Sequence, residues 1–154
     1  MKKKTKRNLI IAAIVIVLIA AGAAWFIYPF IRYSSHTLAY RSALPGNACY
    51  QYPIQYSKEG WFLIDCTLNG THEVPLRIDT QATSLMREDS IQAYGGEYWG
   101  NLPIKSTNAY QEKNSPELYT FTSIAFGEAS IQEPMFNGIR KDNVIYDVID
   151  EGVF

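Results

Sequence analysis

The pattern of hydrophobic and polar positions divides the chain into one long apolar segment and a later region of short runs. Residues 9–31 carry no charge and are almost wholly apolar. A helix needs about 20 such residues to cross the hydrocarbon core of a bilayer. Trp25, Tyr28 and Tyr33 gather towards the end of the segment, and amphipathic rings favour the membrane–water interface. The pattern therefore predicts one transmembrane helix over residues 9–31, in direct contact with lipid.

The residues before this segment set its expected orientation. Residues 1–8 form a basic tail, and no acidic residue occurs before the apolar run ends. Short basic segments stay on the cytoplasmic side, so the rest of this single-pass protein is expected on the periplasmic or extracellular side. A cleaved signal peptide is the alternative, because Ala21-Gly22-Ala23 matches a cleavage-site pattern. The apolar run continues beyond that tripeptide, which favours an uncleaved anchor.

Beyond a mixed, turn-rich lead-in at residues 32–55, the hydrophobic pattern becomes that of strands. From Trp61 to Leu68, alternate side chains are apolar, and polar side chains lie between them. This period of two indicates a half-buried strand. Asn69-Gly70 follows, a dipeptide typical of tight hairpin turns, and a second apolar run leads from Val74 to Thr80. The two runs predict a β-hairpin.

The rest of the chain contains further short elements and no long amphipathic helix. Residues Arg87–Tyr94 predict a short helix that ends at Gly95-Gly96. The polar tract Ser106–Glu117 is expected to be an exposed loop or hairpin tip. Further strands are predicted at Leu118–Phe126, Ile131–Ile139 and Val144–Tyr146, with a turn at Gly127-Glu128. This strand content predicts a small all-β domain over residues 56–154.

The charge of this domain argues against nucleic acid as a partner. Once the five cations of the N-terminal tail are set aside, nine basic residues remain against 15 acidic ones, a net charge of about −6. Such a surface repels phosphates. Asp147, Asp150 and Glu151 form an acidic cluster without the ligand spacing of a calcium loop. We therefore interpret this cluster as a solvated loop.

The two cysteines give no sign of a metal site or cofactor. Cys49 and Cys66 lack CxxC spacing, and His36 and His72 do not cluster with them, which argues against zinc. If the domain is exported, an oxidising environment favours a Cys49–Cys66 disulfide. Two buried free thiols are equally compatible with the sequence.

One tract carries candidate chemistry. Val74–Ile78 is an apolar strand that leads directly into Asp79-Thr80, and small residues follow. The tract resembles the active-site region of retropepsin-like aspartic peptidases, in which a strand delivers Asp-Thr/Ser-Gly to a turn at a dimer interface. The preceding hairpin and Gly152-Val153-Phe154 also fit that family, so the resemblance covers about residues 56–154. An ordinary turn, closed by local hydrogen bonds of Asp and Thr, is the alternative interpretation.

The resemblance implies a small retropepsin-like barrel half-domain and gives individual residues roles. Asp79 would be the catalytic carboxylate, Thr80 the hydroxyl that links two active-site loops, and Ala82 and Thr83 the small residues behind them. Peptide hydrolysis at such a site needs two carboxylates that share one proton, because like charges so close cannot both ionise. The sequence contains one such Asp, so the resemblance implies a homodimer or a second peptidase half.

Two departures from the family pattern leave activity open. Gln81 replaces a glycine that lets backbone amides approach the carboxylates closely. The sequence also stops at Phe154, where the family continues into a helix and a final strand, so an incomplete half-domain is expected. The predicted function is hydrolysis of peptide bonds by a membrane-anchored, extracytoplasmic protein without a cofactor. The alternative is an inactive module that dimerises or binds a peptide or protein.

Overall fold

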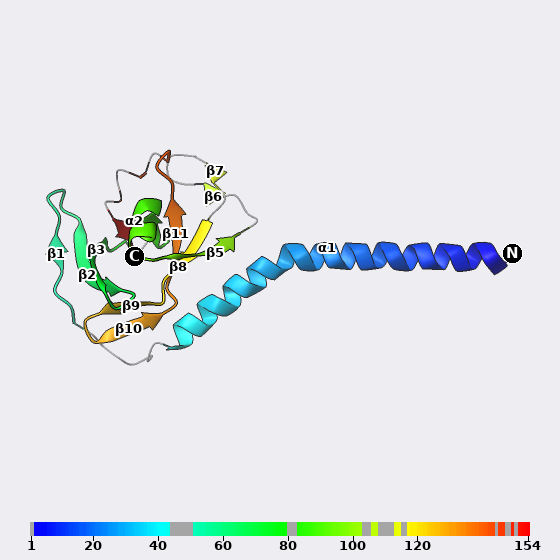
Figure 1. Cartoon of the computed structure of the whole chain (residues 1–154), viewed down its shortest axis with the longest axis horizontal. Coiled ribbons are helices and arrows are strands. Elements are labelled where there is room, and N and C mark those ends of the chain that lie inside the picture. The colour runs from blue at the N-terminus through cyan, green and yellow to red at the C-terminus, as the bar shows by residue number, and fades with distance from the viewer. Residues whose placement is uncertain are drawn as a thin grey trace. The chain divides into compact units, whose positions relative to one another are not determined.

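The computed structural model contains a long N-terminal helix and a β domain (Figure 1). It separates into two units, Met1–His36 and Thr37–Phe154. The structure describes residues 2–43, 51–79, 83–102, 106–107, 113–114, 117–143, 145–146, 149 and 151–154.

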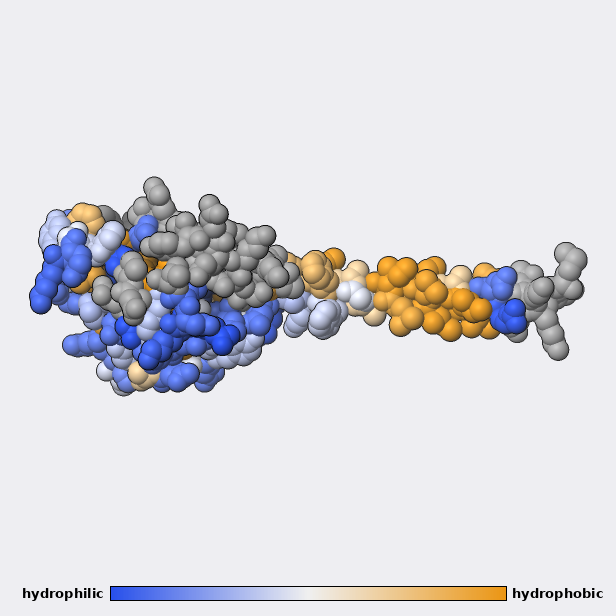
Figure 2. Space-filling view, turned by 90° about the horizontal axis from the view of Figure 1, so that it is seen from above, coloured by the Kyte–Doolittle hydropathy of each residue, from blue (hydrophilic) through white to orange (hydrophobic). Residues whose placement is uncertain are grey.

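Helix α1 extends over Lys2–Ala43. Within it, Arg7–His36 is long and apolar enough to cross a bilayer, and its most apolar stretch is not buried inside the structure. Figure 2 shows this stretch as a band of hydrophobic side chains along the helix. A signal sequence would meet the same criterion of length and composition. The helix continues past residue 31, through part of the segment that the sequence indicates as a turn-rich lead-in.

The described part of the second unit is mostly strand. Its strands are β1 (Gln55–Tyr56), β2 (Phe62–Leu68), β3 (His72–Arg77), β4 (Leu85–Arg87), β5 (Glu97–Asn101), β6 (Ser106–Thr107), β7 (Lys113–Asn114), β8 (Glu117–Thr120), β9 (Ser123–Phe126), β10 (Ala129–Gln132), β11 (Met135–Ile139) and β12 (Gly152–Val153). Among the described residues, one sheet has the order β10-β9-β2-β3-β12-β4-β11-β8-β5, with β1 also against β2. Strands β6 and β7 pair separately, as expected for a hairpin tip.

Strands β2 and β3 form the predicted hairpin. They pair antiparallel along their length. Asn69 and Gly70 have φ angles of 51° and 71°, which are the left-handed conformations of a type I′ turn. Thr71 N closes the turn by donating to Leu68 O at 3.1 Å. Cys66 and Leu68 are buried near the turn, which confirms the predicted alternation there.

The chain after residue 116 forms four strands where the sequence predicted two uninterrupted ones. Pro134 has no N–H to donate to a ladder, and Glu133 adopts a φ of 50°. Glu133 N still donates to Thr122 O at 3.0 Å, and Phe121 N donates to Pro134 O at 3.3 Å. Both chains of this hairpin therefore bend at the same level. On one side of the bend, β9 and β10 continue the sheet beside β2, whereas on the other side β8 and β11 lie between β4 and β5.

The strand expected at Val144–Tyr146 is wrong in its described part, because Ile145 and Tyr146 lie in a turn. Asn143 binds both amides. Its side-chain oxygen accepts from Ile145 N at 3.1 Å, and its carbonyl accepts from Tyr146 N at 3.0 Å. Asparagine commonly satisfies nearby backbone in this way, which removes these amides from strand pairing. Val144 lies outside the described residues.

Helix α2 (Glu88–Ala93) confirms the short helix predicted before Gly95-Gly96. Gly96 N donates to Ile91 O at 2.7 Å, and Gly95 N donates to Gln92 O at 3.4 Å. With Gly95 at a φ of 73°, these bonds form a Schellman cap, which satisfies carbonyls at the end of the helix. The helix packs beside β4 and β11, on the strands that follow the Asp79 region.

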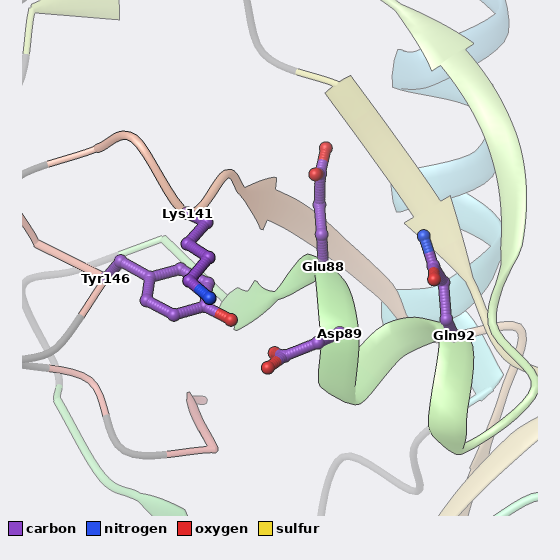
Figure 3. A pocket seen from close by; sticks show the side chains of 5 residues that line it. All are labelled: Glu88, Asp89, Gln92, Lys141 and Tyr146. Carbon is purple, nitrogen blue, oxygen red and sulfur yellow. The ribbon is translucent and has the colours of Figure 1, made fainter.

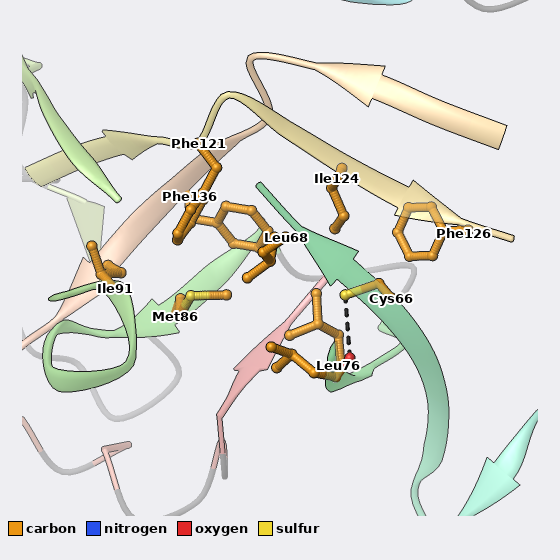
Figure 4. Close-up of a cluster of buried hydrophobic side chains, with 10 residues drawn as sticks. Cys66, Leu68, Leu76, Met86, Ile91, Phe121, Ile124, Phe126 and Phe136 are labelled. Carbon is orange, nitrogen blue, oxygen red and sulfur yellow. Dashed lines mark hydrogen bonds between the residues drawn. The ribbon is translucent and has the colours of Figure 1, made fainter. Parts of the chain in front are cut away.

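Apolar side chains from β2, β3, β4, β9, β11 and α2 form the main core (Figure 4). Its buried members are Cys66, Leu68, Val74, Leu76, Met86, Ile91, Phe121, Ile124, Phe126 and Phe136. The ring of Phe154 packs on this cluster, with its centroid 5.2 Å from Phe126 and 5.9 Å from Phe136. Burial of one such side chain contributes about 1.5–3 kcal/mol, so the end of the sequence is tied to the core.

Candidate functional site

Asp79 follows the last residue pairs of β3, and its backbone is held from both sides. On one side, Ile78 N donates to Phe62 O of β2 at 3.0 Å. On the other, Phe154 N donates to Arg77 O at 2.8 Å, and Asp79 N donates to Phe154 O at 3.3 Å. The backbone of Asp79 is therefore built into the sheet, while its side chain is exposed.

Strand β12 places the end of the sequence beside Asp79. It runs parallel to β3 and antiparallel to β4, and so fills the gap between them. A Cβ on Gly152 would come within 2.8 Å of the backbone oxygen of Leu85. Real Cβ atoms do not approach that closely, so this close passage of β12 needs a glycine.

Asn137 of β11 binds Thr83 and Ser84, the first described residues after Asp79. Asn137 N donates to Ser84 O at 2.9 Å. Its side-chain Nδ2 donates to the same oxygen at 3.1 Å and to Thr83 Oγ1 at 3.3 Å. Sequence reasoning missed Asn137, because an asparagine within a strand pattern carries no signal of a distant partner. The described segments on both sides of residues 80–82 are therefore anchored by residues that come much later in the chain.

Of the residues that the resemblance groups with Asp79, the structure describes only Thr83. Thr80, Gln81 and Ala82 lie outside the described residues, so the linking hydroxyl assigned to Thr80 stays a prediction. Thr83 is described, and its hydroxyl contacts Asn137 at 3.3 Å.

An apolar surface lies next to the strand that carries Asp79. Ile54, Tyr56, Trp61 and Phe62 at the β1–β2 hairpin are between 46% and 70% exposed. Phe62 and Cys66 lie on the same face of β2. This face is buried in the core at Cys66 and is exposed at Phe62. The surface is therefore able to bury apolar side chains of a peptide or of another protein.

A buried cation also approaches this surface. The guanidinium of Arg77 lies 4.1 Å from the ring centroid of Trp61, and Arg77 is only 8% exposed. The arrangement sets a cation against one of the exposed aromatic rings of this surface.

A shallow hollow of about 220 Å³ lies elsewhere, at the start of α2 (Figure 3). Glu88, Asp89, Gln92, Lys141 and Tyr146 line it. Arg87 holds Asp89 with two bonds, at 2.7 Å and 3.1 Å, and this bidentate pairing lowers the pKa of the Asp89 carboxyl. The hollow is thus bordered by a surface ion pair, and Asp79 is not among its lining residues.

Metal ligands do not gather in the described part of the chain, where no group of three or more His, Cys, Asp or Glu is placed to hold an ion. Of the acidic cluster expected near residue 150, the structure describes only Glu151. Asp147 and Asp150 lie outside the described residues. Glu151 differs from a solvated loop residue, because its Oε2 accepts from Ser90 Oγ at 2.6 Å and from Tyr94 OH at 3.2 Å.

Cys66 is a free thiol in the core. Its Sγ donates to Val74 O at 3.2 Å. Burial, with a smaller contribution from the charge of Asp65, raises the pKa of this thiol to about 12. Cys49 lies outside the described residues, so the Cys49–Cys66 pairing stays a prediction.

Thiol labelling is expected to distinguish the two states of the cysteines. With a pKa of about 12, about one thiol in 10⁴ is ionised at pH 8, and only the thiolate reacts. The folded chain should therefore leave Cys66 unlabelled by Ellman's reagent over hours, whereas denaturant without reductant should expose two reactive thiols. If denatured chains release none until a reductant is added, the cysteines are joined and the free-thiol state is wrong.

The fold and site thus define a mostly-β domain, preceded by one long apolar helix, with an exposed aspartate held where a strand leaves the sheet. No family model matches the chain. No curated protein matches it either. Among solved structures, it is similar to a retropepsin-like aspartic protease from Rickettsia conorii, at 16% sequence identity and a TM-score of 0.43, with 69% of this chain and 80% of that chain covered.

Proposed function

We propose that this chain is a membrane-anchored, aspartic-peptidase-like protein whose Asp79 supplies one carboxylate of a paired site. The observation that carries the proposal is the placement of Asp79. It stands exposed at the end of β3, with its backbone bonded to Phe154 and its neighbour Ile78 bonded to Phe62. Such a frame presents a carboxylate to a partner while the strands behind it stay fixed.

The chemistry of the proposed site follows from two such carboxylates. One, ionised, takes a proton from a water that attacks the scissile carbonyl, while the other, protonated, polarises the carbonyl oxygen. Each chain contributes Asp79, so a second copy or a separate peptidase half completes the pair. The exposed apolar side chains at Tyr56, Trp61 and Phe62 supply a surface for apolar parts of a peptide.

The proposed location rests on the N-terminal helix. Arg7–His36 is apolar and long enough to span a bilayer, and residues 1–8 are basic. A basic flank favours the cytoplasmic side, which supports a location of the β domain outside the cytoplasm.

Gln81 favours a second candidate function, that of an inactive binding or dimerisation module. A glutamine side chain occupies space that a glycine would leave open for backbone amides near the carboxylates. A domain of this kind would keep the strand-end frame and the apolar surface, and would bind a peptide or a second copy without cleaving it.

A cleavage assay on the full chain in lipid nanodiscs tests the proposal. We expect it to cut an unfolded, internally quenched protein substrate, with pepstatin inhibition and an optimum between about pH 2 and 5, where two coupled carboxylates share one proton. Gln81→Gly should preserve or raise the rate. Dimerisation or peptide binding without cleavage at any pH, in both wild type and Gln81→Gly, would instead identify the binding module.

A further inference from the structure

Glu151 joins the end of the sequence to helix α2. Its Oε2 accepts from Ser90 Oγ at 2.6 Å and from Tyr94 OH at 3.2 Å. Its backbone oxygen accepts from Arg87 N at 3.3 Å. Ser90 is 5% exposed, so this contact is largely shielded from water. Burial and the nearby charge of Glu151 together raise the pKa of the Tyr94 phenol.

The residues after Glu151 lead directly to the Asp79 frame. Gly152 pairs with Met86, and Val153 pairs with both Leu85 and Arg77. Phe154 then exchanges the two backbone bonds that hold the strand end at Asp79. A shift of this short segment would break its register with β3 and β4 together, so whatever fixes residue 151 also fixes the partner of the Asp79 amide.

We propose that Glu151 is a positioning residue for Asp79, because it clamps the start of β12 to α2 and so holds Phe154 against the strand end. The inference rests on the proposed function for its catalytic consequence. The clamp itself rests on the contacts of Glu151, and amide exchange measures it independently of any activity. Hydrogen bonds to a charged acceptor are stronger than those between neutral groups, which suits a carboxylate for this role.

Site-resolved amide exchange of the full chain in nanodiscs tests the clamp. In Glu151→Ala, the amides of Asp79 and Phe154 are expected to exchange about 10- to 100-fold faster, since local opening becomes easier. The amides of the β2–β3 hairpin should keep their rates. Glu151→Gln should restore most of the protection, because the side-chain amide oxygen still accepts from Ser90 and Tyr94.

Two further variants keep the test decisive. Tyr94→Phe removes one donor from the helix side and should give a smaller acceleration at the same two amides, even if Glu151→Ala fails to fold. Glu128→Ala, an exposed glutamate at the β9–β10 turn, should change nothing. Unchanged exchange at Asp79 and Phe154 in both clamp variants, or equal acceleration throughout the core, would overturn the positioning role.

The cleavage assay separates failure of the clamp from failure of the proposed function. If the chain is a peptidase, Glu151→Ala should lower kcat about tenfold or more with KM little changed, and Glu151→Gln should recover it. An inactive wild type with accelerated exchange in Glu151→Ala leaves the clamp standing and rejects the peptidase. If the wild type is active and Glu151→Ala leaves kcat unchanged, Glu151 does not position Asp79 for catalysis.

Discussion

The Asp79→Asn variant is expected to lose peptide cleavage, with kcat/KM falling about 10³-fold or more. Asparagine keeps the shape of aspartate but neither ionises nor carries a carboxylic proton, so neither role in a shared-proton pair survives. Because the Asp79 side chain is exposed, the free energy of unfolding should change by less than about 0.5 kcal/mol. The quenched-substrate assay and thermal unfolding by circular dichroism, made on one preparation, measure the two quantities.

Asp142→Asn is the matched control for this prediction. The Asp142 side chain is 82% exposed, and its Oδ1 lies 3.8 Å from Arg140 Nε. The substitution removes the same charge as Asp79→Asn but outside the Asp79 frame, so the cleavage rate should stay at the wild-type value. Where a second copy completes the pair, mixing wild-type chains with an excess of Asp79→Asn chains should also suppress activity, because most wild-type chains would then be paired with a variant chain. Cleavage by Asp79→Asn at the wild-type rate would show that another group performs the reaction.

The local elements of the fold were predictable because their signals lie within a few residues of each other. Asn69-Gly70 supplies left-handed conformations between two apolar runs, and the β2–β3 hairpin forms there. Gly95-Gly96 likewise ends α2 where a left-handed residue is needed. The apolar strand that leads to Asp79 is the same kind of short-range signal, and β3 forms there, although it ends at Arg77, before the predicted end at Thr80.

The frame around Asp79 was less accessible to sequence reasoning because it is assembled over long separations. Asn137 and Glu151 look like ordinary polar residues of a strand and an acidic loop, and their partners on the Thr83–Ser84 segment and on α2 emerge only from the sheet order. The bend at Glu133-Pro134 was missed for a related reason. The bend moves the two halves of one hairpin to different parts of the sheet. The alternation of apolar and polar residues indicates a strand but carries no information about such a bend.

Replacement of Asn69 by alanine is expected to destabilise the β domain by about 4 kcal/mol. Its Oδ1 accepts from Thr122 N at 2.7 Å, and its Nδ2 donates to Tyr94 O at 2.8 Å and to Gly95 O at 3.3 Å. Each neutral bond contributes about 1 kcal/mol, and alanine adds about 1 kcal/mol of strain at a φ of 51°. A loss of this size should lower Tm by about 10–20 °C, measured by the near-ultraviolet circular dichroism of the full chain.

Asn69→Gly separates the two causes, because glycine tolerates the left-handed φ but makes none of the three bonds. Its Tm should therefore lie between those of wild type and Asn69→Ala. Asn101→Ala is the matched control, since it loses one exposed bond from Tyr98 OH and should stay within about 0.5 kcal/mol of wild type. If Asn69→Ala unfolds at the wild-type temperature, the side chain does not join the hairpin, α2 and the β8–β9 corner as its contacts indicate.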